Sequence, residues 1–377
     1  MQVNQIKDLM NDITFEILGD RIVEENLQNI VDVGTSIFNA TSVDNYVKSL
    51  VNHVGKVIFV DRVYRGSATS VLMDAWEYGS VLEKIHTDLP QATENESWSL
   101  VNGQSYDPNI FYQPTAHAKF YNKRVTFEIP MSFTEKQVKE SFSNPQQLAS
   151  FIAMIRNSVE KSMTVKLDGL VSRTINAFMG ELLQNGASIN LFELYGNVAD
   201  TTGLDSIEKI ISNPDFIRFA TYTMSLYSDR LTKISKLFNI GETDKFTPKE
   251  YQHMILLSDF ARASEIYLQS NTYHNDLVKL GTYETVPFWQ SPSRTYDVDN
   301  NSRLSIQLPS DGTSLSQSGI LGVIFDRDAL GVSNLDLRVT SNYNPKGEFF
   351  NEWYKMDAGY FIDTNENGIV FFVDNYE

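Results

Sequence analysis

The longest regular feature of the chain is a series of apolar residues at helical spacing that begins at Leu148 and continues for many turns. Asn144 followed by Pro145 is a typical helix start, and Gly186 is a typical stop. The pattern predicts one helix over about residues 145–185, roughly 60 Å long. Few helices of compact proteins reach this length.

A second pattern, with period two, predicts strands on either side of an irregular stretch. Residues 80–89 alternate, with Glu83 and Ile85 on one side and Lys84 and His86 on the other. A shorter alternation at residues 125–129 predicts another strand.

About thirty irregular residues lie between these two strands. Such an excursion is uncommon inside a compact monomer, and it would be natural if it lay across a neighbouring subunit. Its aromatic residues, together with one close to the second strand, are therefore candidates for contacts between subunits: Trp98, Tyr106, Phe111, Tyr112 and Phe120.

Weaker signals fill the rest of the chain. Near the N-terminus they predict a short helix within residues 11–26, without an independent core, then a helix over 43–53 and a strand at 57–60. A capping box at residues 132–135 predicts a short helix to about residue 142. Further helices are expected at 207–212, 216–238 and 259–269, and strands at 254–257, 304–308, 322–325, 335–341, 349–361 and 369–373. Asn367-Gly368 predicts a hairpin turn between the last two strands.

Composition narrows the class of protein. The chain has 377 residues, 42% hydrophobic and 21% charged, with a net charge of −17, which are values of a folded protein. It contains no cysteine, so disulfides, thiolate metal sites and cysteine nucleophiles are excluded. We see neither a signal peptide nor a membrane span, and expect a soluble cytoplasmic product. The acidity argues against a direct grip on phosphate backbones.

The search for chemistry yields little. The five histidines lack metal-ligand spacing, although His86 and His117 could meet across a sheet. Phosphate-binding glycine loops and nucleophile elbows are absent. A partial calcium-loop pattern is formed by four residues: Asp363, Asn365, Asn367 and Asp374. Strands flank this pattern and its last position lacks the usual Glu, so we expect no catalytic, cofactor or metal site.

The order of the elements, together with local motifs, resembles the Hong Kong 97-type major capsid proteins of tailed phages. Residues 79–88 (GSVLEKIHTD) resemble a strand of the E-loop in small podovirus capsid proteins. Residues 253–260 (HMILLSDF) are similar to an axial-domain strand and helix. Residues 324–332 (IFDRDALGV) and 344–347 (NPKG) resemble late segments of the family.

The resemblance implies an α+β capsid fold with named parts. These would be an N-terminal arm with the first helix and strand at 1–60, an E-loop at 61–132, a peripheral domain at 133–195 and 321–377 that contains the spine helix at about 145–185, and an axial domain at 196–320. It implies a non-enzymatic protein that assembles into the icosahedral or prolate head shell.

The resemblance also implies partners. These are other copies in pentamers and hexamers, a separate scaffolding protein, the portal protein, a decoration protein and packaged double-stranded DNA held without sequence-specific binding, but no membrane. The protein would be assembled in the host cytoplasm and located in the virion. The alternatives are an encapsulin-like compartment shell, an acidic cytoplasmic hydrolase and another phage part such as a tail or sheath protein.

Overall fold

The computed structural model describes residues 3–24, 27–41, 43, 45–50, 68, 71–73, 82–87, 89–90, 92–113, 115–269, 282–290 and 297–374. The chain forms two compact units, which are described separately below. Unit 1 comprises Met1–Tyr78, Arg124–Val171 and Val332–Gly359, and unit 2 comprises Gly79–Lys123, Ser172–Gly331 and Tyr360–Glu377. Helix and sheet occur in both, so the expected α+β class is confirmed. The strand expected at 57–60 lies outside the described residues.

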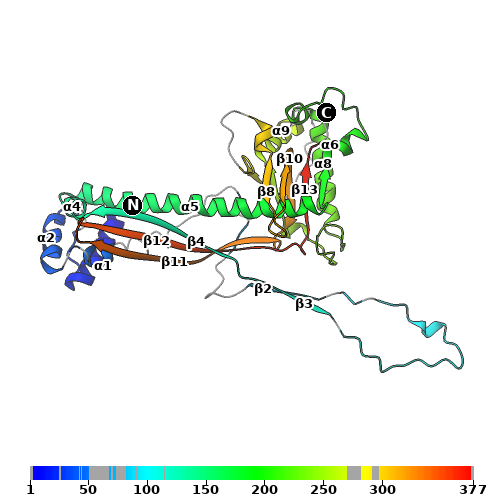
Figure 1. The fold of residues 1–377 in the computed structure, drawn as a ribbon, viewed down its shortest axis with the longest axis horizontal. Helices are drawn as coiled ribbons and strands as arrows, with labels where there is room; N and C mark the ends of the chain where they lie inside the picture. Colours follow the sequence, from blue (N-terminus) through cyan, green and yellow to red (C-terminus); the bar gives the residue numbers. More distant parts are fainter. Residues whose placement is uncertain are drawn as a thin grey trace. The chain divides into compact units, whose positions relative to one another are not determined.

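Unit 1 combines helices with a mixed sheet (Figure 1). Its elements are α1 (Val3–Leu18), α2 (Ile30–Ala40), β1 (Leu72–Met73), β4 (Arg124–Thr134), α4 (Glu135–Ser141), the first part of α5 (Pro145–Gln184), and most of β11 (Leu330–Asn344) and β12 (Phe349–Ile362). The strand order is β1-β11-β12-β4, and β4 pairs antiparallel with β12 over its whole length.

The N-terminal helices contradict the expectation of a segment without a core. α1 begins at Val3, well before residue 11, and buries Met10 and Ile13 completely, as α2 does with Ile30 and Ile37. The helix expected over 43–53 is present at residues 43 and 45–50. The buried apolar stripes were too short to stand out as a core in the sequence, because each helix contributes only a few positions.

The capping box before α4 is present but lies two residues later than predicted. The Thr134 side chain accepts from the Gln137 N–H at 3.3 Å, and the Gln137 side chain accepts from the Thr134 N–H at 2.9 Å. Ser132 belongs to β4 instead, where its hydroxyl lies 2.6 Å from the Asn351 side chain of the paired strand. The prediction at residues 132–135 was wrong because the apolar alternation of β4 continues through Met131 and Phe133, which places Ser132 inside the strand.

Unit 2 contains a five-stranded sheet in the order β5-β13-β10-β6-β7. The strands of this sheet are β5 (Ser188–Asn190), β6 (Gln252–Leu257), β7 (Glu284–Val286), β10 (Ile320–Asp326) and β13 (Gly368–Phe372). The other elements are α6 (Leu191–Gly196), α7 (Ile207–Ile211), α8 (Pro214–Arg230), α9 (Ser258–Gln269), α10 (Val298–Asn301), the short helices η3 (Glu96–Trp98) and η4 (Lys249–Tyr251), and the strand pairs β2 (Leu82–Thr87) with β3 (Ala116–Tyr121) and β8 (Leu304–Gln307) with β9 (Ser314–Gln317). All seven residues of the central strand β10 are buried.

The long helix α5 is confirmed, with the predicted start and stop. The Asn144 side chain accepts from the Gln147 N–H at 2.8 Å. At the other end Gly186 has a φ of +76°, and the Ala187 N–H donates to the Leu182 carbonyl at 2.9 Å. This is the Schellman arrangement, in which a glycine takes the left-handed conformation that ends a helix.

The hairpin predicted at Asn367-Gly368 is wrong. β12 pairs with β4, whereas β13 pairs with β10 and β5 in another sheet. The Asn367 side chain is buried and bonded to Asn239 and Thr247, and a Cβ on Gly368 would lie 2.8 Å from the Phe178 ring. The dipeptide therefore serves close packing, which has the same sequence signature as a tight turn.

The helix predicted at 216–238 is shorter than expected. α8 ends at Arg230, and the chain then folds back on itself, since the Thr247 N–H donates to the Leu231 carbonyl and Ser235 forms an antiparallel bridge with Lys245. Strand β9, which pairs with β8, lies between the strands predicted at 304–308 and 322–325, where we predicted no element. The named capsid domains stay a proposal; the structure groups 321–331 and 360–377 with the range 196–320.

Candidate functional site

The irregular excursion is an extended hairpin of unit 2. β2 and β3 pair antiparallel from Leu82↔Tyr121 to Thr87↔Ala116, so β2 pairs with β3 and not with the strand predicted at 125–129. The long connection beyond them, drawn in cyan in Figure 1, contains only the short helix η3 among its described residues. The strand pattern of β3 was missed because two of the three residues that alternate on its exposed face, Ala116, Ala118 and Phe120, are alanines, which are poor strand formers.

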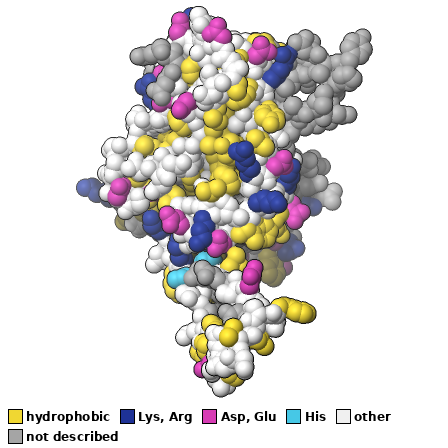
Figure 2. Space-filling model, turned by 90° about the vertical axis from the view of Figure 1, so that its right-hand side faces the viewer, with side chains coloured by type: hydrophobic (Ala, Val, Ile, Leu, Met, Phe, Trp, Pro, Cys, Tyr) yellow, Lys and Arg dark blue, Asp and Glu magenta, His cyan; other side chains and the backbone are white. Residues whose placement is uncertain are grey.

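The five predicted contact residues are all exposed. Their exposed fractions are 99% for Trp98, 42% for Tyr106, 82% for Phe111, 80% for Tyr112 and 63% for Phe120. Leu100, Val101 and Ile110 on the same connection are also more than half exposed. Figure 2 shows hydrophobic side chains at the surface of the hairpin, at the bottom of the view. Exposed apolar groups at this density are uncommon on the surface of a monomeric protein.

The two faces of the paired strands differ in chemistry. The half-buried residues of β2 are Leu82, Lys84 and His86, whereas Glu83, Ile85 and Thr87 are exposed. Ile85 pairs with Ala118, which places it diagonal to Phe120 on the outer face. Ile85 and Phe120 are therefore largely exposed, whereas the basic Lys84 and His86 are half-buried on the other face.

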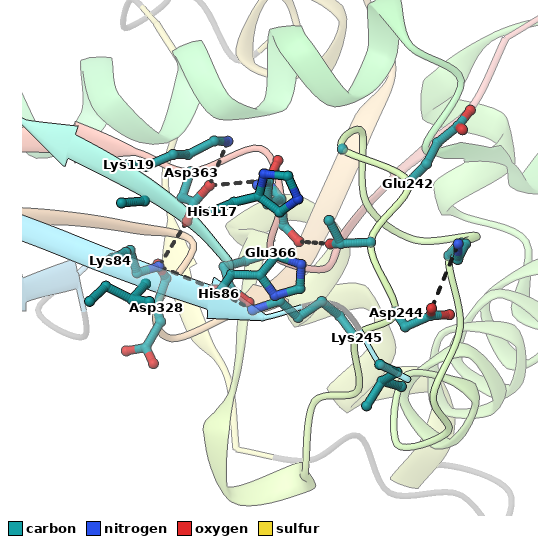
Figure 3. A pocket seen from close by; sticks show the side chains of 17 residues that line it. Lys84, His86, His117, Lys119, Glu242, Asp244, Lys245, Asp328, Asp363 and Glu366 are labelled. Atoms are coloured by element: carbon teal, nitrogen blue, oxygen red, sulfur yellow. Dashed lines mark hydrogen bonds and ion pairs between the residues drawn. The ribbon is translucent and has the colours of Figure 1, made fainter. Parts of the chain in front are cut away.

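The basic face lines a pocket of about 850 Å³, shown in Figure 3. The hairpin forms one side with Lys84, His86, His117 and Lys119. The loop at 236–245 and the turn at 363–366 form the others. The expectation that the two histidines meet across a sheet is confirmed, since His86 and His117 are directly paired and their stacked rings are 6.1 Å apart.

Three lysines and two carboxylates form one ion-pair network in this pocket (Figure 3). Asp363 accepts from Lys84 at 3.0 Å with one oxygen and from Lys119 at 3.2 Å with the other. Glu366 lies 3.3 Å from Lys84 and 3.0 Å from Lys245. Because the Asp363 side chain is only 4% exposed, solvent screens its pairs less than surface pairs.

The electrostatic environment favours the ionised form of Asp363. Burial raises the pKa of its carboxyl, but the charges of Lys84 and Lys119, with hydrogen bonds from Lys84 and the Asn365 N–H, lower the pKa by more. The carboxylate is therefore charged at neutral pH. Sequence reasoning placed Lys84 on one strand face but missed its partners, since 279 residues separate it from Asp363.

Beneath the pocket, buried polar side chains join the loop to the turn. Asn239 donates to Asn367 at 3.3 Å, Asn367 donates to Thr247 at 3.2 Å, and Thr247 donates to Asp326 at 2.7 Å. Burial raises the pKa of Asp326, although the Asp328 N–H and Thr247 counteract it. This chain of hydrogen bonds fixes the position of the turn that carries Asp363.

The residues of the calcium-loop pattern do not converge on one point. Asp363 accepts from two lysines, and the Asn367 side chain belongs to the buried network. A Cβ on Gly241 would lie against the Asn365 side chain, whereas the Asp374 carboxylate accepts from Gln317 at 3.1 Å. Within the described residues, His, Asp and Glu side chains do not gather in threes that could bind a metal ion. None of the helices in the described part of the chain has the length and apolar character needed to cross a bilayer.

Comparison with solved structures returns phage capsids at low sequence identity. The capsid structure of Staphylococcus phage Andhra matches with 11% identity and a TM-score of 0.49, over 83% of this chain and 86% of that one. The capsid structure of the Cyanophage P-SCSP1u matches with 10% identity and a TM-score of 0.42, over 81% and 87%. The mature capsid of bacteriophage PhiM1 matches with 9% identity and a TM-score of 0.43, over 84% and 88%. No curated protein matches the sequence.

The sequence itself matches a family model. The model describes the Phi29-like phage major capsid protein, and the match covers residues 6–372, nearly the whole chain. The chain therefore belongs to the family of Phi29-like phage major capsid proteins.

Proposed function

We propose that this capsid protein, a shell-building component of the virion, joins its neighbours through the hairpin at residues 82–121. The observation that carries the proposal is the exposure of aromatic side chains along a segment that buries almost nothing in its own unit. Trp98, Phe111 and Tyr112 are each at least 80% exposed. Burying aromatic groups of this size against a second copy would contribute about 1.5–3 kcal/mol each, which is how a shell of many weak contacts gains stability.

The finer features of the shell follow as proposals. Copies would form pentamers and hexamers in an icosahedral or prolate head of Hong Kong 97-type, with the E-loop at 61–132, the axial domain at 196–320, and the peripheral domain at 133–195 and 321–377. Head-to-tail contacts that close into rings suit a hairpin that reaches in one direction.

The other partners are proposals too. They are a separate scaffolding protein, the portal, a decoration protein and packaged DNA, in a shell assembled in the host cytoplasm. A net charge of −17 supports DNA held without a sequence-specific grip, because backbone contacts require clustered lysine and arginine. The family is structural, and we propose no catalytic role. The family match speaks against the encapsulin, hydrolase and tail-protein alternatives.

The test is removal of the hairpin surface. Deleting residues 92–109 should leave a folded chain that no longer forms shells, as seen by circular dichroism and negative-stain electron microscopy after light scattering. A second variant, with the same residues replaced by a Gly/Ser stretch of equal length, keeps the chain length and should behave alike. Shells of normal yield from the Gly/Ser variant would contradict the proposal, and so would an unfolded, insoluble deletion variant.

A further inference from the structure

The base of the hairpin is held by a carboxylate that bridges its two strands. Lys84 on β2 and Lys119 on β3 are directly opposite in the register, and the two oxygens of Asp363 accept from one lysine each. A single side chain thus holds both strands at once. The Lys84 ammonium also donates to the Asp328 carbonyl at 2.6 Å and to Glu366, so it has three acceptors for its three N–H groups.

The contact with Asp363 determines which of the two faces of the β2–β3 ribbon points toward the rest of unit 2. If the ribbon rotated about its axis, its two faces would exchange places: Phe120 would turn inward and the two lysines would turn away from Asp363. This rotation would be unfavourable because the largely buried carboxylates of Asp363 and Glu366 would lose the lysines that pair with them.

The carboxylate that does this is itself held in place. The Asp363 N–H donates to the Ala329 carbonyl at 2.6 Å, and the next residues are tied to the loop through the Thr364 carbonyl, which accepts from the N–H groups of Ile240 and Gly241. Because the Asp363 carboxylate is held in a fixed position, it can orient the lysines of the hairpin. A carboxylate on a flexible turn would instead move together with the lysines.

We propose that Asp363 is a positioning residue for assembly: by bridging Lys84 and Lys119 it fixes which face of the hairpin is offered to a second copy. The proposal rests on the proposed role of the hairpin in joining neighbours. Tyr121 packs on Phe361 with ring centroids 5.3 Å apart, a contact that a rotated ribbon would also lose. Among the described residues, Lys236 forms its ion pair with Asp244 of its own loop, at 3.6 Å.

Lysine acetylation read by mass spectrometry tests the proposal on unassembled full-length chains. The Lys84 side chain is 22% exposed and that of Lys136 is 82% exposed, so Lys84 should react more slowly in the unaltered protein. Asp363→Asn should raise the rate at Lys84 by about tenfold relative to Lys136, and Asp363→Asn with Glu366→Gln should raise it further. Asp363→Glu should restore slow labelling.

Assembly is measured in parallel on the same variants. Asp363→Asn and Lys119→Gln should reduce the fraction of chains in closed shells, while Lys236→Gln, at the same pocket but off the hairpin, should not. Lys119→Gln is free of the concern that a core variant unfolds, since its side chain belongs to the hairpin. Unchanged Lys84 labelling in Asp363→Asn, or normal shells from both variants, would overturn the proposal.

The two proposals fail separately. If the Gly/Ser hairpin variant forms normal shells, the hairpin is not the joining segment, yet the labelling of Lys84 on free chains still reports whether Asp363 orients it. If that variant fails to assemble and Asp363→Asn labels and assembles normally, the hairpin joins copies without an orienting carboxylate.

Discussion

Strands β6 and β2 are both six residues long and lie in the same unit, but they use their side chains in opposite ways. The last four residues of β6, Met254–Leu257, are all apolar, and they are buried between the neighbouring strands β10 and β7. β2 alternates, and it turns its basic residues inward and Ile85 outward. Alternation in a sequence reveals a strand, but it does not say which side is buried in the monomer. In a protein that builds a shell, the apolar side can be reserved for another copy.

The largest difference between the two regions is expected for truncation of a buried ring. Phe325 on β10 packs against Phe178 at 5.9 Å and His253 at 5.8 Å. Phe325→Ala should lower the free energy of unfolding by about 3–5 kcal/mol, whereas Ile85→Ala on the hairpin should change it by less than about 0.5 kcal/mol. Urea denaturation followed by circular dichroism measures both. Equal losses would mean that the hairpin belongs to the core.

A helix cap should have an effect between these limits. Asn144→Ala removes the acceptor for the Gln147 N–H at the start of α5 and should cost about 1 kcal/mol. Asn144→Ser retains an acceptor and serves as the matched control. If both variants unfold at the same urea concentration as the unaltered protein, the cap does not contribute to stability.

The buried sheet also carries a pH dependence, through His253. Burial lowers the pKa of His253 from its ordinary value of 6.5, with Glu284 opposing and Arg327 reinforcing the shift. The unfolded chain then binds more protons than the folded one just below pH 6.5, so stability is complete above that pH and is lost as the pH falls toward the folded pKa. His253→Gln should reduce the loss between pH 7.5 and pH 5.5 in urea denaturation. An unchanged pH slope in that variant would assign the dependence to other groups.

The smallest effect on folding stability is expected for the exposed aromatic residues of the hairpin, where we expect a large effect on assembly. Phe111→Ser should leave the free energy of unfolding within about 0.5 kcal/mol of its normal value, because the ring is 82% exposed. The same variant should reduce the yield of shells seen by light scattering and electron microscopy. Val165→Ser, on an exposed position of α5, is a control for loss of one apolar surface residue. A stability loss in Phe111→Ser as large as that in Phe325→Ala would remove the contrast between the regions.

Sequence patterns located elements whose signals are local. The cap, the proline and the terminal glycine of α5 lie within a few residues of the ends they define, so the helix was predicted nearly to the residue. The strand and helix at 252–269 and the outward aromatics of the hairpin were identified for the same reason.

Pairing between distant segments was beyond local patterns. The dipeptide Asn367-Gly368 suits both a tight turn and a closely packed contact, so the sequence alone does not distinguish them. The contacts of Asn367 with Asn239 and of Gly368 with Phe178 show that here it forms a close contact. The partners of Lys84 lie at Asp363 and Glu366, and neither has a neighbour in sequence that marks it. Alternation gave the face of Lys84, whereas the face of Lys119 and the carboxylates opposite both lysines came from the fold alone.

The strand order of the central sheet has a consequence for the order of synthesis. β13 lies between β5 and β10, although it is translated last of the five strands. Until residue 372 has left the ribosome, β10 has one unpaired edge, and β5 lacks its neighbour. A growing chain therefore carries its hairpin long before its sheet can close, and an open edge invites wrong pairing between chains. Rapid completion of translation, or a chaperone that covers β10 in the meantime, would protect nascent chains from premature association.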